Sequence, residues 1–210
     1  MEINLTRKFG RPDVRRASRI CSRAFQDAPH VAHFFPDEAS RARNAVELFR
    51  MRIRYGLQYG EVHTLSPDVE GLAVWLPSEN AAMSMWKQIR AGGMRLYRTV
   101  GSDAVARMTH VAEHNDHLRL QYAPGKHWFL SILAVDPDQH GRGFATSLLD
   151  PMLARLDREE LPAYAETTER ELLAFYQRFG FEPGTESTVP GTDLTVWPLV
   201  RRTKTREADR

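Results

Sequence analysis

Cysteine and long apolar runs are scarce in this chain of 210 residues. Cys21 is its one cysteine, which excludes an intrachain disulfide and a zinc site built on several cysteines. No apolar run approaches the roughly 20 residues of a membrane span, and the first residues lack the apolar core of a signal peptide. We therefore expect a soluble, cytoplasmic protein that does not associate with membranes.

Excess charge of either sign is also missing. The formal net charge is +2, which gives no reason to expect binding to nucleic acid. The sequence pI near 8.8 is compatible with an anionic small ligand. With 42% hydrophobic residues, the chain can form one domain with a substantial core. We expect that domain over residues 1–200, followed by a charged, disordered tail over 201–210.

Several familiar catalytic and phosphate-binding signatures are absent. His140–Ala145 reads HGRGFA, without the Lys-Ser/Thr that ends a P-loop. The same loop lies two-thirds along the chain and lacks the third glycine of a dinucleotide fingerprint. No Gly-x-Ser-x-Gly elbow occurs, which disfavours a serine hydrolase.

What the chain does contain is an organised stretch from Trp128 to Leu149. Residues 128–135 form an apolar run without Gly or Pro, which predicts a buried strand that ends before Pro137. Gly141 and Gly143 follow, and then apolar residues at helical spacing. The first amides of a helix lack intrahelical partners and lie at its positive end, so a strand, glycine loop and helix in this order suit a phosphate or diphosphate.

This stretch resembles the acetyl-CoA-binding motif of the GNAT acyltransferases, Gln/Arg-x-x-Gly-x-Gly/Ala. The pattern falls on His140, Gly143 and Ala145, with His in place of Gln or Arg. Two further pieces are similar to that family, in order and at its spacing. Pro162–Thr167 (PAYAET) looks like its next strand, and Phe175–Glu182 (FYQRFGFE) looks like its Tyr-x-x-x-Gly-Phe helix end.

Within the family, Lys126–Phe181 looks most like the branch that contains puromycin N-acetyltransferase. It shares an aromatic-rich strand, a Leu-Pro before the next strand and a Glu-Thr at its end. The first half of the chain is similar only in layout. The resemblance implies an α/β GNAT fold, in which helices flank a mixed, mostly antiparallel sheet with one splayed parallel strand pair.

The resemblance also implies acetyl-CoA as co-substrate, without a metal. The pantetheine arm would hydrogen-bond as a pseudo-strand to the main chain of Leu133, Ala134 and Val135. The diphosphate would lie on the backbone amides of the glycine loop, which comprises Gln139, His140, Gly141, Arg142, Gly143, Phe144 and Ala145.

The implied reaction is direct transfer of the acetyl group to a primary amine of a small molecule in a ternary complex. An ammonium has no lone pair, so a base or a water must take its proton. Tyr176 occupies the family's position for the acid that protonates the departing thiolate. We rank Glu166 first as base, with His127, the acids and histidines of the variable half, or a water chain as alternatives. Leu172 stands where the family often has an Asn that contacts CoA.

Three alternatives remain open. His110, Glu113 and His114 match an inverted zinc-protease motif, with His117 as a candidate third ligand, although so short a pattern arises readily by chance. The amine could instead belong to a peptide or protein. The chain could also be a non-catalytic module that binds acyl-CoA, which His140 and Leu172 favour and Tyr176 opposes.

The rest of the chain gives ordinary helix and strand patterns. In the variable half, a set of Met, Leu and aromatic residues could wall the acceptor site: Met83, Met85, Trp86, Met94, Leu96 and Tyr97. The resemblance also leaves open whether the chain forms a homodimer, because the last strand often contributes to dimers in this family. We expect strands at Met1–Phe9, Glu61–Leu65, Glu70–Leu76, Thr185–Val189 and Leu194–Val200, helices from Pro12 to Phe25 and from Asp37 to Gln58, a loop at Asp27–Pro36, and helices over Asn80–Leu120 that break at Gly92-Gly93 and Gly101-Ser102.

Overall fold

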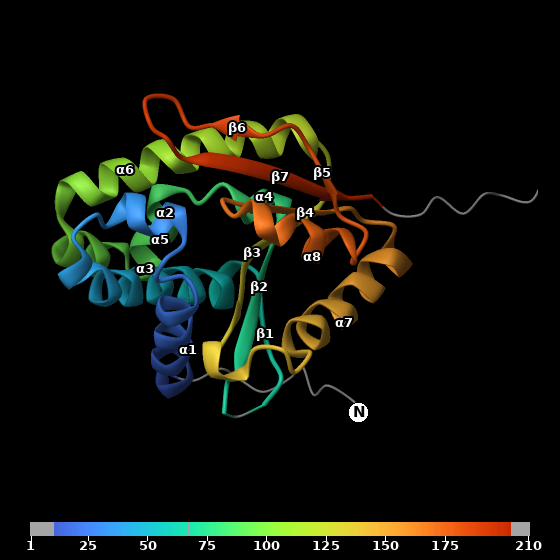
Figure 1. The fold of residues 1–210 in the computed structure, drawn as a ribbon, viewed down its shortest axis with the longest axis horizontal. Coiled ribbons are helices and arrows are strands. Elements are labelled where there is room, and N and C mark those ends of the chain that lie inside the picture. The colour runs from blue at the N-terminus through green and yellow to red at the C-terminus, as the bar shows by residue number, and fades with distance from the viewer. Residues whose placement is uncertain (1–10, 67, 203–210) are drawn as a thin grey trace, which may run out of the picture.

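The computed structural model describes residues 11–66 and 68–202. The strand expected at Met1–Phe9 and residues 203–210 of the expected tail lie outside these residues, whereas Arg201, expected in that tail, belongs to a strand. The described chain forms one seven-stranded sheet with helices on both faces (Figure 1). Six strands follow the order β1-β2-β3-β4-β7-β5, and β6 pairs with β7 beside them. The strands are β1 (Glu61–Thr64), β2 (Gly71–Pro77), β3 (Trp128–Val135), β4 (Ala163–Thr167), β5 (Glu182–Pro183), β6 (Ser187–Thr188) and β7 (Thr195–Arg201).

The sheet is antiparallel except between β3 and β4. These two strands pair in parallel only where Trp128 faces Ala163 and Phe129 faces Tyr164. From Leu130 onward, the recorded pairings of β3 among the described residues are those with β2. The two strands therefore splay apart, and the mixed α/β fold with a splayed parallel pair is confirmed.

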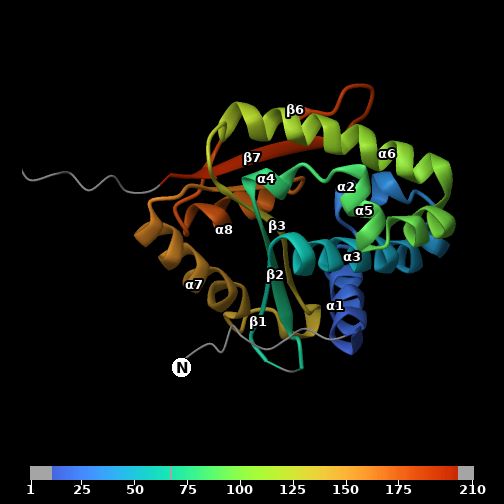
Figure 2. The ribbon, with the colours of Figure 1, turned by 180° about the vertical axis from the view of Figure 1, so that it is seen from behind.

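Helices cover the two faces of the sheet unequally. The six helices that precede β3 pack on one face, and α7 and α8 pack on the other (Figure 1). The longest helix, α6, runs along β7 (Figure 2). The helices are α1 (Arg11–Ala24), α2 (Pro29–Phe34), α3 (Glu38–Tyr59), α4 (Ser78–Ala81), α5 (Met85–Ala91), α6 (Gly93–Tyr122), α7 (Phe144–Glu159) and α8 (Leu173–Gln177), with short 3-10 turns η1 (Pro137–Gln139) and η2 (Arg170–Leu172).

The alternation of side chains along β2 divides the core between these two layers. Leu72, Val74 and Leu76 belong to the core beneath α1–α6, whereas Ala73 and Trp75 belong to the core beneath α7 and α8. All five residues are at most 1% exposed, so β2 is buried on both faces. An apolar run without alternation is therefore what this central strand requires.

Local signals account for several helix boundaries. The side chain of Asp37 accepts a hydrogen bond of 3.2 Å from the amide of Ala39 and caps α3. Gly92, with φ 112°, ends α5, and Gly101, with φ 81° and ψ 175°, breaks α6 where a break was expected. None of the described helices combines the length and the apolar character that crossing a bilayer requires.

Two secondary-structure predictions were wrong in detail. The loop expected over Asp27–Pro36 contains the helix α2, which starts at Pro29 and buries Val31 and Phe34. Six residues are too few to show helical periodicity, and a proline suits the first turn of a helix. The strand expected at Thr185–Val189 is reduced to Ser187–Thr188, and the two-residue strand β5 was not predicted.

Candidate active site

The splay between β3 and β4 opens onto a cavity of about 680 Å³. Residues 129–133 of β3 and 166–168 at the end of β4 line one side of it. The other walls come from α2, α3, α5, α6 and α8. Glu166 and Tyr176, expected as base and acid, both line this cavity together with Leu133.

Glu166 is held in place by hydrogen bonds from two other elements. Its Oε1 accepts from Asn115 Nδ2 of α6 at 2.7 Å, and its Oε2 accepts from the Tyr164 hydroxyl at 3.4 Å. Protein surrounds the carboxyl except on its cavity side, and this burial raises the pKa of Glu166, although the Asn115 bond and the Arg52 charge oppose the shift. A raised pKa makes the carboxylate a stronger base than an exposed glutamate.

Tyr176 belongs to α8 and is 7% exposed. Its ring packs edge-on against Phe175 at 5.3 Å and Phe181 at 5.7 Å between ring centroids. None of the hydrogen bonds recorded for residues 11–66 and 68–202 uses its hydroxyl. Burial, followed by the charge of Glu169, raises the pKa of Tyr176, so the phenol keeps its proton.

The polar part of the cavity carries more acidic than basic groups. Its carboxyl groups belong to Glu113, Asp116, Glu166 and Glu169, and its guanidinium groups belong to Arg52 and Arg119. Arg119 and Asp116 neutralise each other in an ion pair of 2.8 Å. Burial and the Arg52 charge lower the pKa of His30 to about 3, so its ring is neutral. An acidic surplus of this kind attracts an ammonium ion.

The rest of the cavity lining is largely apolar and rich in methionine. Five of the seven methionines line it: Met51, Met83, Met85, Met94 and Met108. Leu96 and Tyr97, also expected at an acceptor wall, contribute as well. Trp86 does not contribute, since it is 78% exposed and outside the lining. Unbranched thioether side chains adapt to apolar ligands of different shapes.

The glycine loop has the geometry that a diphosphate requires. Gly141 and Gly143 have φ 77° and 80°, which glycine adopts most readily, and Gly143 is the N-cap of α7. A Cβ built on either glycine meets no atom within 4 Å, so the space in front of the α7 amides is open. The splayed edge of β3 ends at this loop. Together, the loop and this edge fit the diphosphate and pantetheine arm of acetyl-CoA.

His140, the departure from the family motif, turns toward its own strand. Its Nε2–H donates to the carbonyl of Val135 at 3.2 Å, because a carbonyl can only accept. The ring therefore ties the loop to the end of β3. Ala134 is buried, so it offers a ligand only its main chain.

His127, His110 and His114 make hydrogen bonds away from Glu166 and Tyr176. His127 is 3% exposed, donates from Nδ1 to Gly125 O at 2.7 Å and is not part of the cavity lining. His110 Nε2 donates to Pro190 O at 2.8 Å, and His114 Nε2 lies 3.1 Å from Ser187 Oγ. These two rings fasten α6 to the β6–β7 hairpin. Among the residues described, no three or more His, Cys, Asp or Glu side chains form a group that could hold a metal.

Comparisons with known proteins agree with this geometry. Residues 102–183 match the family model described as an acetyltransferase (GNAT) domain. That segment spans most of α6, the splayed strands, the glycine loop and α8. The chain is also 22% identical over 185 residues to an uncharacterized N-acetyltransferase of Schizosaccharomyces pombe, covering 80% of this chain and 70% of that protein. Residues 102–183 therefore resemble a GNAT acetyltransferase domain, and the chain is an acetyltransferase.

Solved structures share the whole fold at low sequence identity. A Corynebacterium glutamicum protein described as histone acetyltransferase HPA2 and related acetyltransferase superposes with a TM-score of 0.67 at 18% identity, over 95% of this chain and 96% of that one. A candidate arylalkylamine N-acetyltransferase 7 of the mosquito Aedes aegypti gives a TM-score of 0.58 at 15% identity, over 92% and 84%. The finer resemblance to the puromycin N-acetyltransferase branch is not tested by these matches and stays a prediction.

Proposed function

We propose that this chain transfers the acetyl group of acetyl-CoA to the primary amine of a small molecule with an apolar body. One observation carries the proposal: a single cavity holds Glu166 and Tyr176 near the splayed strands and five methionines on its other walls. Its volume, about 680 Å³, falls in the range of roughly 300–1,000 Å³ typical of small-molecule sites. The likeness to a candidate arylalkylamine acetyltransferase supports an amine of this kind.

Glu166 acts as the base in this proposal. The acidic surplus of the cavity draws in the ammonium form of the substrate, and the Glu166 carboxylate takes its proton directly or through one water. Asn115 holds Oε1 of Glu166, which leaves Oε2, with its longer 3.4 Å contact to Tyr164, as the oxygen freer to accept that proton. The methionines hold the apolar body and exclude water.

Tyr176 acts as the acid. Its hydroxyl keeps its proton because burial raises its pKa, and it has no recorded partner among the described residues that would compete for that proton. When bound, acetyl-CoA supplies the acetyl group for direct attack by the amine, with the thiolate of CoA as leaving group. The open edge of β3 at Leu133, Ala134 and Val135 would position the pantetheine arm, and the amides of residues 139–145 would bind the diphosphate.

The test is a panel of amines with release of free CoA thiol as the readout. Phenethylamine-type and tryptamine-type amines should give a higher kcat/KM than short diamines or a peptide with a free N-terminus. A preference for the peptide would transfer the proposal to peptide amines. Tight binding of acetyl-CoA without turnover of any amine would support a non-catalytic module instead.

A matched pair of variants tests the apolar wall. Met94→Ser should raise KM for the aromatic amines several-fold with little change in kcat, because Met94 lines the cavity and is 47% exposed. Leu120→Ser is the control, since Leu120 lies on the same helix, is 55% exposed and does not line the cavity. Equal effects of both substitutions would contradict the placement of the apolar body.

A further inference from the structure

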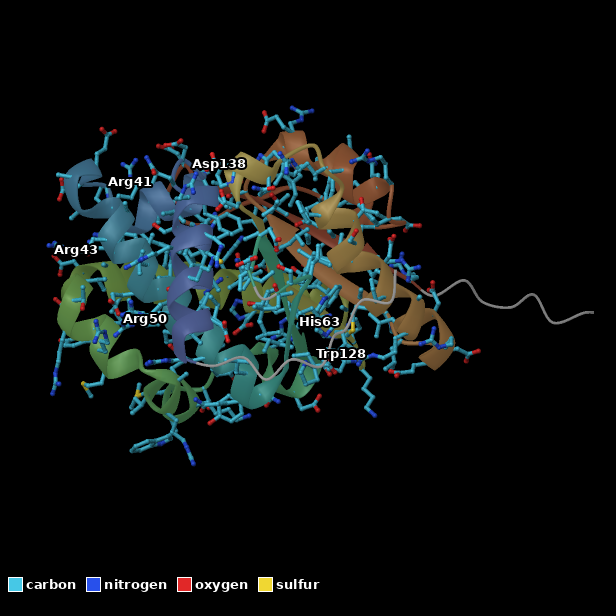
Figure 3. All side chains as sticks on the ribbon, turned by 90° about the horizontal axis from the view of Figure 1, so that it is seen from below. Arg41, Arg43, Arg50, His63, Trp128 and Asp138 are labelled. Atoms are coloured by element: carbon cyan, nitrogen blue, oxygen red, sulfur yellow. The ribbon has the colours of Figure 1, made fainter. Side chains whose placement is uncertain are left out.

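A second cavity, of about 1050 Å³, lies between α1, α3 and the start of α6. Its lining is almost entirely basic: Arg15, Arg16, Arg19, Arg50, Arg54 and Arg95. Arg50 lies on α3 close to α1, on the face that Figure 3 shows. None of these arginines lines the cavity of Glu166 and Tyr176 or belongs to the glycine loop.

The sequence places several of these charges in pairs that oppose helix formation. Arg15 and Arg19 lie four residues apart on α1, and Arg50 and Arg54 do the same on α3. Like charges at this spacing share one helix face and destabilise the helix. The folded chain then brings both pairs to one cavity, which adds repulsion between the helices.

Only part of this charge is balanced by carboxylates. Glu47 accepts from Arg95 Nε at 2.8 Å and from Arg50, and Asp68 pairs with Arg16 at 3.1 Å. The hydrogen bond from Arg95, above all, lowers the pKa of Glu47. Within the described part of the chain, no recorded ion pair or side-chain hydrogen bond involves the guanidinium groups of Arg15, Arg19 or Arg54. Three unpaired guanidinium groups therefore face one cavity from two helices.

We propose that this cavity binds a compact polyanion that carries several phosphate groups. A guanidinium donates two parallel hydrogen bonds to phosphate oxygens and stays charged at every physiological pH, so arginine is the residue best suited to such a ligand. The ligand neutralises the repulsion between these arginines. Glu47 anchors the side chains of Arg50 and Arg95 at the rim and so orders part of the site before binding.

The same lining argues against a nucleic acid strand. Among the described residues that line the cavity, Val14 is the single apolar one and none is aromatic. Single strands are usually held by bases stacked on aromatic rings along a positively charged groove. Here the arginines surround a concave space, and the net charge of the whole chain is only +2. A small phosphorylated molecule fits this arrangement better than a polymer.

Calorimetric titration of the full chain with inorganic tripolyphosphate tests the proposal. We expect a saturable site at the arginines whose affinity falls as sodium chloride is added, and this site remains when Gly143→Glu blocks any phosphate binding at the glycine loop. The double substitution Arg19→Ala and Arg54→Ala should raise Kd about tenfold or more, because it removes two charge-assisted contacts. It should not lower Tm in phosphate-free buffer, because it removes repulsion and no recorded ion pair.

A control and a competing site make the outcome decisive. Arg43→Ala with Arg98→Ala removes the same charge from exposed residues of α3 and α6 outside the cavity, and should leave Kd within about twofold. Gly143→Glu, which blocks the glycine loop, should also leave Kd unchanged. The proposal fails if tripolyphosphate does not bind, if both double variants weaken it equally, or if Gly143→Glu abolishes binding while the Arg19 and Arg54 variant retains it.

Two further titrations identify the ligand class. A nucleoside triphosphate that binds at least as tightly as tripolyphosphate, and is lost in the same variant, indicates that the phosphates belong to a nucleotide. Weaker nucleotide binding indicates a free or differently substituted polyphosphate, and both results support the site. A single-stranded oligonucleotide that binds more tightly than either would overturn the assignment to a compact ligand.

Discussion

The substitution Tyr176→Phe distinguishes a catalytic role of the Tyr176 hydroxyl from a packing role of its ring. The substitution keeps the ring contacts with Phe175 and Phe181 and removes one oxygen. Since that oxygen has no hydrogen bond recorded within the described chain, its removal breaks none of those bonds. We expect the free energy of unfolding to change by about 1 kcal/mol or less. In a chain of 210 residues, that corresponds to a shift in Tm of about 2–4 °C at most.

The expected effect on turnover is much larger. A positioned acid contributes about 100-fold to 10,000-fold to rate, so kcat should fall at least about 100-fold. That fall equals about 2.7 kcal/mol of activation free energy, more than the change in stability. The Kd for acetyl-CoA should stay within about twofold, because the proposed cofactor contacts lie on β3 and the glycine loop. Thiol release measures kcat, and calorimetry measures Kd.

Tyr97→Phe is the matched control for this prediction. Tyr97 lines the same cavity and is 49% exposed, and its hydroxyl has no hydrogen bond recorded among residues 11–66 and 68–202. Its substitution should leave kcat within about threefold. The reasoning is refuted if Tyr176→Phe leaves kcat equally unaffected, or if it weakens acetyl-CoA binding by the same factor by which it lowers turnover.

Three further predictions concern the base, the glycine loop and the core. Glu166→Gln keeps an acceptor for Asn115 but should lower kcat about 100-fold. Burial raises the pKa of Glu166 in the folded chain, so the wild type loses stability as pH rises through that pKa and the carboxyl ionises. Gln stays neutral, so the Tm of the variant should exceed that of the wild type at pH 8 and approach it at pH 4. Gly143→Glu should abolish calorimetric binding of acetyl-CoA while the chain stays folded, since its Cβ meets open space and the φ of 80° costs only about 1–2 kcal/mol. Gly56→Ala places a Cβ 2.5 Å from Val74 Cγ1, between α3 and β2, and should destabilise the chain by about 1–3 kcal/mol in a urea titration.

Specific results would contradict each of these expectations. A wild-type activity that stays flat from pH 4 to pH 8, or a Glu166→Gln variant with the same Tm difference at both pH values, would remove the ionisation argument. Acetyl-CoA binding by Gly143→Glu would place the diphosphate elsewhere. Unchanged urea stability in Gly56→Ala would mean that α3 moves away from β2 without loss of packing.

The sequence predicts those parts of the fold whose signals are local. The apolar run of β3, the two glycines and the helix after them are contiguous, so their order alone indicates the unit. Asp37 and Gly101 mark an N-cap and a break within one or two residues. The helix α2 was missed because its two buried residues are too few to define a period.

The surroundings of the candidate site could not be predicted, because they depend on long-range contacts. Asn115 donates to Glu166 across 51 positions of sequence, and no local pattern connects an asparagine in α6 with a glutamate at the end of β4. The motif of His110 and His114 suggested zinc, whereas both rings bind a hairpin more than 70 residues away. The arginine cavity did leave a trace in the sequence, as two like-charged pairs at helical spacing, but only the packing of α1 against α3 joins them.

The short pairing of β3 with β4 has a mechanical consequence. Two residue pairs, Trp128 with Ala163 and Phe129 with Tyr164, join the half-sheet of β1, β2 and β3 to the half-sheet that contains β4 and β7. They lie at the narrow end of the splay and would act as a hinge between two arms, one of which carries Glu166 beyond the hinge. A small rotation at the hinge becomes a larger displacement further along the arms. A substitution of Trp128, which does not line the cavity, could therefore tune the spacing between the arms, and with it the choice of acceptor, without touching the ligand.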